Sequence, residues 1–170
     1  MKLFIPDMYQ KDIFTIPYQK LKEMGYQLLI FDLDNTIGSI KEKNCNLETI
    51  NFLNQLSKDF LIVIASNSHK KRVQSFCRNL KCKYYSLSLK PTLKVLRKIK
   101  KDYNIDYQKM VIIGDQVVTD ILVGNRKKIL TILVDPILNY DLKITGFNRL
   151  VEKILNKKNG IIKGQYYEKK

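Results

Sequence analysis

The chain has 170 residues, a net charge of +15 and 45% hydrophobic residues, which suits one globular domain with a buried core. No apolar run is long enough to span a bilayer. Its three cysteines lack CxxC spacing, which argues against a zinc site and a disulfide framework. We expect a cytoplasmic protein, because Pro6 and Asp7 interrupt the segment where a secretory signal would need an apolar stretch.

The positive charge comes from 31 lysines and arginines against 16 acidic residues. Such a charge predicts attraction to polyanions, namely nucleic acid, an anionic membrane surface or phosphorylated substrates. A lysine-rich composition explains the charge equally well, so the charge alone does not select a partner.

Five short apolar runs predict strands, in chain order over residues 27–31, 60–65, 83–85, 110–113 and 130–134. Most of these runs do not alternate with polar residues, which is typical of strands covered on both faces. The run over 83–85 is the shortest and is expected at an edge of the sheet.

Apolar residues recur at helical spacing between the expected strands, over 47–56, 73–80 and 93–103. Ser68 and Thr92 are placed to cap the second and third of these helices, and Gly124 can end a short helix over 117–123. Strands that alternate with helices predict parallel pairing through right-handed crossovers. We therefore expect a doubly wound α/β fold, a three-layer sandwich with about five parallel strands.

The expected domain covers residues 1–156. It divides into a catalytic core over 27–134 and an N-terminal extension over 1–26. Residues 157–170 are expected to form a basic, flexible tail.

Polar side chains follow four of the expected strands at the carboxyl edge of the sheet, where ligands bind in doubly wound folds. In chain order they are Asp32, Asp34, Thr36, Ser66, Asn67, Lys90, Asp115, Gln116 and Asp120. Asp32, Asp34 and Asp115 together would repel one another unless a cation lay among them. An incomplete shell of oxygen ligands favours Mg²⁺, and the single histidine argues against zinc.

Phosphoryl transfer fits this set of residues. Asp32 can act as a nucleophile that forms an aspartyl-phosphate. Asp34 would point to the same side if the strand geometry continued, and it can protonate the leaving group and later accept a proton from water. Donors for the phosphate are expected from Ser66, Asn67, Thr36 and Lys90. Asp120 is expected to support the metal or act as an alternate ligand, and Gln116 to support it.

These residues resemble the four motifs of the haloacid dehalogenase superfamily: DxDxT over 32–36, Ser66-Asn67, Lys90, and Gly114-Asp115 with Asp120. The acid two residues after Asp32 resembles the phosphatase branch. The flanking segments 4–9, 124–126 and 148–152 are similar to the YqeG-type class IIIA phosphatases. Relatives of that class in mitochondria and plastids dephosphorylate phosphatidylglycerophosphate, so the resemblance implies that substrate.

A capping domain over the site is not expected, because residues 38–60 and 68–90 are each too short to hold one of about 40 residues beside their helix. An open site suits a phosphate on a large molecule, such as a lipid headgroup, a nucleic-acid end or a protein. Basic residues expected at its rim are Lys71, Arg72, Arg126 and Lys127. They would either bind an anionic membrane or form a solvated face.

The leading hypothesis is a Mg²⁺-dependent phosphatase for phosphatidylglycerophosphate, peripheral at the inner face of the membrane. One alternative is a phosphatase for nucleic-acid ends or phosphoproteins, and another is a non-catalytic basic adaptor. The complete set of acids, lysine and serine argues against the adaptor. The basic clusters around Lys70 and Lys127 contain no aromatic residues, which argues against a nucleic-acid reader.

Overall fold

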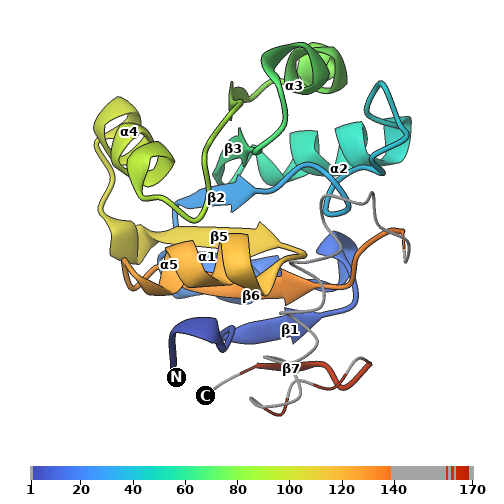
Figure 1. The fold of residues 1–170 in the computed structure, drawn as a ribbon. Helices are drawn as coiled ribbons and strands as arrows, with labels where there is room; N and C mark the ends of the chain where they lie inside the picture. Colours follow the sequence, from blue (N-terminus) through green and yellow to red (C-terminus); the bar gives the residue numbers. More distant parts are fainter. Residues whose placement is uncertain (1, 139–159, 161, 163, 169–170) are drawn as a thin grey trace.

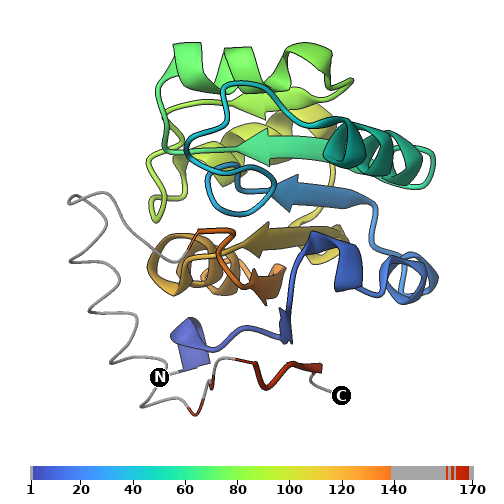
Figure 2. The same cartoon turned by 90° about the vertical axis from the view of Figure 1, so that its right-hand side faces the viewer.

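The computed structural model describes residues 2–138, 160, 162 and 164–168 (Figure 1). Within these residues, strands form one sheet in the order β4-β3-β2-β5-β6-β1-β7. Figure 2 shows β2, β3 and β5 with their arrowheads on the same side. Every helix in the described part of the chain is too short or too polar to cross a bilayer.

The five predicted strands are confirmed. They are β2 (Leu28–Phe31), β3 (Leu61–Ala65), β4 (Lys83–Tyr85), β5 (Met110–Gly114) and β6 (Leu130–Val134), and neighbouring members pair in parallel. β4 lies at one edge, as predicted. Every residue of β2 and β5 is buried, which explains why their sequences show no apolar–polar alternation.

Helices cover both faces of the sheet, so the three-layer sandwich is confirmed. Leu29 and Phe31 of β2 belong to the core that also contains residues from α1 (Tyr18–Glu23), α2 (Leu47–Leu56) and α3 (Lys70–Phe76). Leu28 and Ile30 face the opposite core, under α4 (Lys94–Tyr103) and α5 (Leu122–Asn125). Alternate residues of one strand therefore build two cores.

Two further strands extend the sheet beyond the five predicted ones. β1 (Met8–Gln10) comes from the N-terminal extension and pairs in parallel with β6, and β7 (Tyr167–Glu168) pairs antiparallel with β1. The carboxylate of Asp7 accepts hydrogen bonds from the backbone and hydroxyl of Thr131, both at 3.0 Å. This pair joins the extension to the core.

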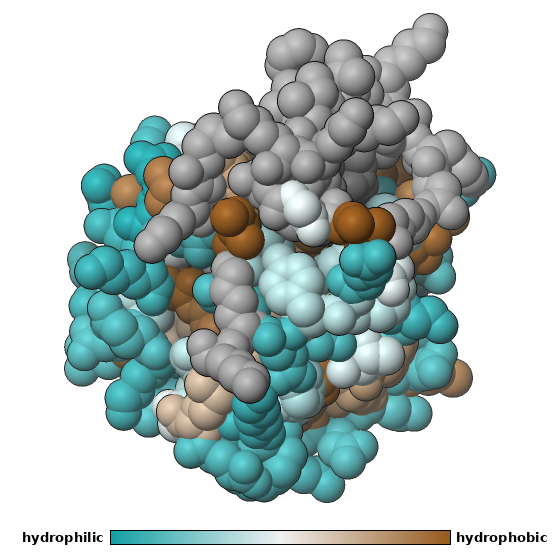
Figure 3. Space-filling view, turned by 90° about the horizontal axis from the view of Figure 1, so that it is seen from below, coloured by the Kyte–Doolittle hydropathy of each residue, from teal (hydrophilic) through white to brown (hydrophobic). Residues whose placement is uncertain are grey.

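β7 lies within the segment predicted as a flexible tail. Its position has a physical basis, because the Tyr167 ring packs on Tyr9 at 6.3 Å and Lys20 Nζ lies 2.6 Å from Glu168 Oε2. The predicted end of the domain and the segment 148–152 lie outside the described residues. Figure 3 views the side that carries β1 and β7, where hydrophilic side chains surround a smaller number of hydrophobic ones.

Two predicted helix caps are wrong. The N-cap of α3 is His69 rather than Ser68, because the Ser68 hydroxyl donates to Asp34 Oδ2 at 2.5 Å. The N-cap of α4 is Leu93 rather than Thr92, and it makes no side-chain cap bond. The short helix predicted over 117–123 is a π-helical turn, η5 (Val117–Ile121), that continues into α5.

The cysteine thiols are free, and Cys45 and Cys77 are buried. Burial raises the pKa of Cys45 to about 11 and those of Cys77 and Cys82 to about 12.

Since only the thiolate reacts, we expect thiol reagents at pH 8 to modify the native protein roughly a hundredfold more slowly than the unfolded protein. Titration with and without guanidinium measures this, and rapid reaction of all three native thiols would contradict it.

Candidate active site

The site lies where the adjacent strands β3, β2 and β5 end. The register pairs Phe31 of β2 with Ile64 of β3 and with Ile113 of β5, so the residues after these strands come together. The Asp32 amide donates to the Ile113 carbonyl at 2.9 Å, which anchors the first motif to β5. Parallel pairing therefore brings together segments that are far apart in the chain.

A carboxylate cluster forms at this edge from Asp32, Asp115 and Asp120, each of which places one oxygen within 4.8 Å of the other two. Lys90 Nζ lies 2.6 Å from Asp32 Oδ1 and 2.6 Å from Asp120 Oδ1. Asp115, Asp120 and Lys90 are buried. Three carboxylates around one ammonium leave an excess of negative charge, and the oxygen donors fit Mg²⁺.

The pKa values reflect this crowding. The pKa of Asp32 is raised to about 8: burial is the largest cause, the Lys90 charge opposes it, and the charges of Asp120 and Asp115 add to it. Burial alone would lower the pKa of Lys90, but the carboxylates of Asp120 and Asp32 outweigh this effect and raise it. Lys90 is therefore a permanent cation in the cluster, and a divalent cation there would favour ionised Asp32.

Asp120 is closer to the centre of the site than predicted. Its carboxylate belongs to the cluster, and it also accepts from the Gln116 amide at 3.3 Å and from the Thr119 hydroxyl at 3.2 Å. A Cβ added to Gly114 would lie 2.3 Å from Asp120 Cγ. Glycine at position 114 is therefore what leaves room for the Asp120 carboxylate.

Asp34 is not a member of this group, although the sequence predicts it as a metal ligand. Its carboxylate accepts from the Ser68 hydroxyl and from Arg72 Nη2, the latter at 3.0 Å. The chain leaves the extended conformation after β2, since Asn35 has a φ of 66° and its amide donates to the Gly38 carbonyl. Because β2 already ends at Phe31, the two-residue repeat that would place Asp34 beside Asp32 does not extend to these residues.

Arg72 has a role that sequence reasoning missed. Besides Asp34, its guanidinium donates to the backbone carbonyls of Ser39 and Glu42 and lies 5.2 Å from the centre of the Phe76 ring. Only 21% of its side chain is exposed, so it is not the free rim cation that the sequence predicts. The sequence held a signal for this role: Arg72 lies one helical turn before the buried Phe76, so both side chains lie on the same face of the helix.

Asn67 binds protein backbone in this structure. Its amide nitrogen donates to the Lys90 carbonyl at 3.0 Å, and its oxygen accepts from the Lys90 amide and the Ser88 hydroxyl at 2.8 and 3.0 Å. Asn67 thus holds the segment that carries Lys90. Its predicted role in binding phosphate stays a prediction.

The predicted donors Ser66 and Thr36 are buried; Ser66 directly follows β3, and Thr36 lies four residues after Asp32. Ser66 Oγ accepts from the Ser68 amide at 3.0 Å, and its own proton is available for donation. The Thr36 hydroxyl has no hydrogen-bond partner among the described residues. Gln116 contributes its backbone amide to Asp120, and its side chain accepts from Thr119 at 3.4 Å.

The predicted basic rim is divided between two edges. Lys127 Nζ lies 5.5 Å from the centre of the Tyr107 ring, in the turn η4 (Tyr107–Lys109) that precedes β5. Lys127 therefore lies at the amino edge of the sheet, because α5 carries the chain from the site at the carboxyl edge back to the amino edge. Arg126 is bound to the Pro91 carbonyl at 3.0 Å.

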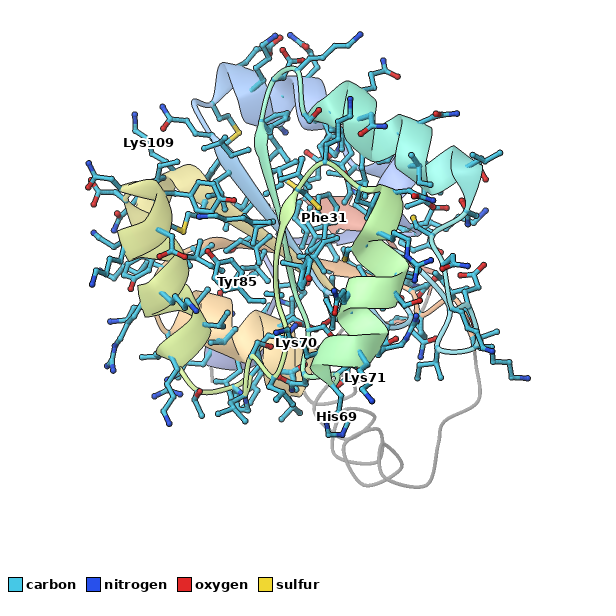
Figure 4. All side chains as sticks on the ribbon, turned by 90° about the horizontal axis from the view of Figure 1, so that it is seen from above. Phe31, His69, Lys70, Lys71, Tyr85 and Lys109 are labelled. Atoms are coloured by element: carbon cyan, nitrogen blue, oxygen red, sulfur yellow. The ribbon has the colours of Figure 1, made fainter. Side chains whose placement is uncertain are left out.

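Lys71 is exposed near the start of α3 at the site edge. In Figure 4 it lies beside His69 and Lys70, and Lys109 lies on the opposite side of the molecule. Lys71 therefore lies at the edge where the sequence predicts a rim cation, and its role in binding stays a prediction.

Comparisons with known proteins agree with this geometry. Residues 89–136 match a family model described as HAD-hydrolase-like. The "Probable phosphatase YqeG" of Bacillus subtilis (strain 168) is 35% identical over 153 residues, which cover 89% of each chain.

Solved structures share the fold. A predicted HAD-like family hydrolase from Porphyromonas gingivalis has a TM-score of 0.54 at 12% identity, over 75% of this chain and 98% of that one. A HAD family enzyme from Bacteroides thetaiotaomicron, solved as a magnesium complex, has a TM-score of 0.55 at 12% identity, over 69% and 97%. At these identities the likeness concerns the fold alone.

The contact between Gly114 and Asp120 generates a test of the carboxylate cluster. Mg²⁺ that binds the native state should raise the melting temperature of the wild-type protein. In Gly114→Ala the added methyl group displaces the Asp120 carboxylate, so we expect most of this Mg²⁺-dependent rise to be lost. Thermal unfolding over a series of Mg²⁺ concentrations measures it.

Gly124→Ala is the matched control, because its added methyl group would clash with Thr131 rather than with the site. This control should melt at a lower temperature than wild type and keep its response to Mg²⁺. A wild-type response in Gly114→Ala would show that Asp120 is not part of the metal site.

Proposed function

Because the chain belongs to the YqeG-type phosphatases of the haloacid dehalogenase family, we propose that it hydrolyses phosphate monoesters with Mg²⁺, through an aspartyl-phosphate on Asp32. The observation that carries the proposal is the position of Asp32. It lies directly after the central strand β2, within the carboxylate cluster and 2.6 Å from Lys90 Nζ. A nucleophilic carboxylate next to a fixed cation suits attack on an anionic phosphate.

Asp32, Asp115 and Asp120 would hold the metal. When bound, Mg²⁺ supplies positive charge that lets a carboxylate approach a phosphate and stabilises the charge on the transferring group. Lys90 adds a second, permanent positive charge. Ser66, which follows β3 at the same edge of the sheet, would donate its hydroxyl proton to a phosphate oxygen.

In the first step, an Asp32 oxygen forms a bond to phosphorus and the bond from phosphorus to the ester oxygen breaks. Asp34 gives its proton to the leaving oxygen. In the second step, Asp34 takes a proton from a water molecule whose oxygen attacks phosphorus. The bond between Asp32 and phosphorus then breaks and inorganic phosphate leaves.

The separation of Asp34 from the carboxylate cluster supports this division of roles. A carboxylate bound to a metal has lone pairs and charge committed to the cation, which makes it a poor proton carrier. Ser68 and Arg72 instead hold Asp34 outside the cluster, two residues from the nucleophile.

We infer that the substrate is phosphatidylglycerophosphate, whose terminal phosphate is a monoester on a lipid headgroup. The described chain from β2 to β6 contains no inserted cap domain, so the site can approach a phosphate fixed in a bilayer. The resemblance to relatives that act on this lipid supports the same substrate. The enzyme would then work in the cytoplasm, at the inner face of the membrane.

Replacement of the nucleophile tests the mechanism. We expect Asp32→Asn to lower turnover by at least about a thousandfold while leaving the melting temperature close to that of wild type, since an amide cannot attack phosphorus. Ser66→Ala should cost about 10- to 150-fold, the equivalent of one hydrogen bond to a charged group. Substantial turnover in Asp32→Asn would remove this residue from the nucleophile role.

The assay uses phosphatidylglycerophosphate vesicles, 5′-phosphorylated oligonucleotides, a phosphopeptide and a soluble aryl phosphate. Each is measured with Mg²⁺ and with a chelator, which should stop all hydrolysis. Preference for the oligonucleotide or the phosphopeptide would replace the lipid substrate and leave the mechanism intact.

The contacts of Arg72 predict a catalytic effect. Arg72→Gln removes the charge that holds Asp34, so we expect a roughly tenfold or greater loss of kcat on every substrate, soluble or lipid. The neighbouring exposed Lys71→Gln is the control and should keep wild-type activity on the soluble ester. Equal activities of the two variants on that ester would contradict a positioning role for Arg72.

A further inference from the structure

The loop between β4 and α4 exposes two leucines directly before Lys90. Leu87 is 50% and Leu89 is 53% exposed, whereas Ser88 between them is buried. Exposed leucines are common on protein surfaces when they occur singly. Here two of them lie on one loop, directly before Lys90.

The backbone at both leucines is in the left-handed region, with φ values of 48° and 53°. Side chains other than Asn, Asp and Gly rarely adopt it, because the Cβ atom comes close to the following carbonyl oxygen. Strain of this kind persists only where surrounding contacts hold it, and it is concentrated at functional sites. The loop therefore presents its leucines to solvent at an energetic cost.

The contacts that hold the loop are those that position Lys90. The Ser88 amide donates to the Ser66 carbonyl at 3.0 Å, and the Ser88 hydroxyl and Lys90 amide donate to Asn67. The Leu87 amide donates to the Ser68 carbonyl at 3.0 Å. The leucines therefore project from a fixed segment directly before Lys90.

A third apolar side chain reaches the same edge from the end of β6. Ile137 is 50% exposed, and its amide donates to the carbonyl of Asn35 in the first motif at 3.0 Å. Positive charge lies next to these groups, because exposed Lys70 and Lys71 follow Ser68 at the start of α3 (Figure 4). Apolar tips beside flexible cations match an anionic bilayer, where both the acyl region and the headgroups find a partner.

We propose that Leu87, Leu89 and Ile137, together with Lys70 and Lys71, form a docking rim that seats the protein on an anionic phospholipid bilayer. This rests on the proposed function in that it assumes a phosphate held at a membrane surface. The leucines enter the interface, the lysines bind lipid phosphates, and the open site then faces the headgroups. A bilayer needs no shape complementarity, which suits separate apolar tips better than a protein partner does.

The chain contains no tryptophan, so a single one introduced into the rim is a unique fluorescent reporter. We expect the emission of Leu89→Trp to shift to shorter wavelength with vesicles of phosphatidylglycerol and phosphatidylcholine, and to be quenched by brominated acyl chains. Leu3→Trp is the matched control, because Leu3 is 45% exposed in η1 (Lys2–Phe4), away from the site edge. Equal shifts for both positions, or none for Leu89→Trp, would overturn the rim.

Loss of the apolar tips is tested by a double variant, Leu87→Asn with Leu89→Asn. Asparagine tolerates the left-handed backbone, so this variant should fold and keep wild-type activity on a soluble aryl phosphate. Vesicle affinity, measured by co-flotation, should fall by at least about tenfold, because two half-exposed leucines no longer enter the interface. Leu3→Asn with Met24→Asn, also on exposed apolar residues, should keep wild-type affinity.

The lysines are tested by the double variant Lys70→Gln with Lys71→Gln. The matched control is Lys101→Gln with Lys109→Gln, since these two exposed lysines lie at the other end of the sheet. The first pair should lose affinity for anionic vesicles by about one to two orders of magnitude, and raising salt should reduce wild-type binding in the same way. Equal losses in both pairs would mean non-specific attraction and reject the rim.

Failure of docking and failure of the proposed function are distinguishable. Vesicle binding is measured with Asp32→Asn, which does not depend on turnover, and hydrolysis is measured with substrate in detergent micelles, which does not depend on docking. Vesicle binding without lipid hydrolysis supports the rim and rejects the substrate. Hydrolysis in micelles without vesicle binding, or binding to an oligonucleotide in its place, rejects the rim.

Discussion

The Lys90 ammonium, held between the carboxylates of Asp32 and Asp120, is the interaction on which the rest of the site depends. Three carboxylates this close and this buried would repel one another strongly without a cation. Lys90 compensates only part of their charge, and the remaining negative charge would favour a bound divalent cation. Neighbouring residues hold these charged groups in place: Asn67 fixes the backbone of Lys90, and Gly114 leaves space for the Asp120 carboxylate.

A second consequence is the separation of two acids that are neighbours in sequence. Asp32 lies in the cluster, where burial and other acids raise its pKa, whereas Asp34 turns away to Ser68 and Arg72. Residues 32–34 thus place one carboxylate in the cluster and the other outside it, which fits the nucleophile and the proton carrier of the proposed mechanism. The two carboxylates lie in different surroundings because both follow the end of β2, where the two-residue repeat of a strand no longer holds.

The two edges of the sheet also divide the basic surface. Crossover helices carry the chain from the carboxyl edge back to the amino edge, so basic residues at the two ends of one helix lie far apart. Lys70 and Lys71 lie beside the catalytic residues, and Lys127 lies near Tyr107 at the other edge. The net charge of +15 therefore says less about the partner of the site than do the few cations at the same edge of the sheet as Leu87 and Leu89.

The sequence by itself was sufficient for the strands β2 to β6, their parallel pairing and the motifs at their carboxyl ends, because hydrophobic periodicity and residue type are local properties. It was insufficient for the extra strands β1 and β7, since these short segments lie outside the alternation of strands and helices and form by pairing with distant partners. Only the tertiary structure decided that Asp120, rather than Asp34, completes the carboxylate cluster. It also decided that Arg72 is hydrogen-bonded within the protein rather than free, and that Lys127 lies at the edge of the sheet away from the site. Each of these depends on which segments meet in space and where the backbone turns, as at Asn35, and residue spacing along the chain does not encode that geometry.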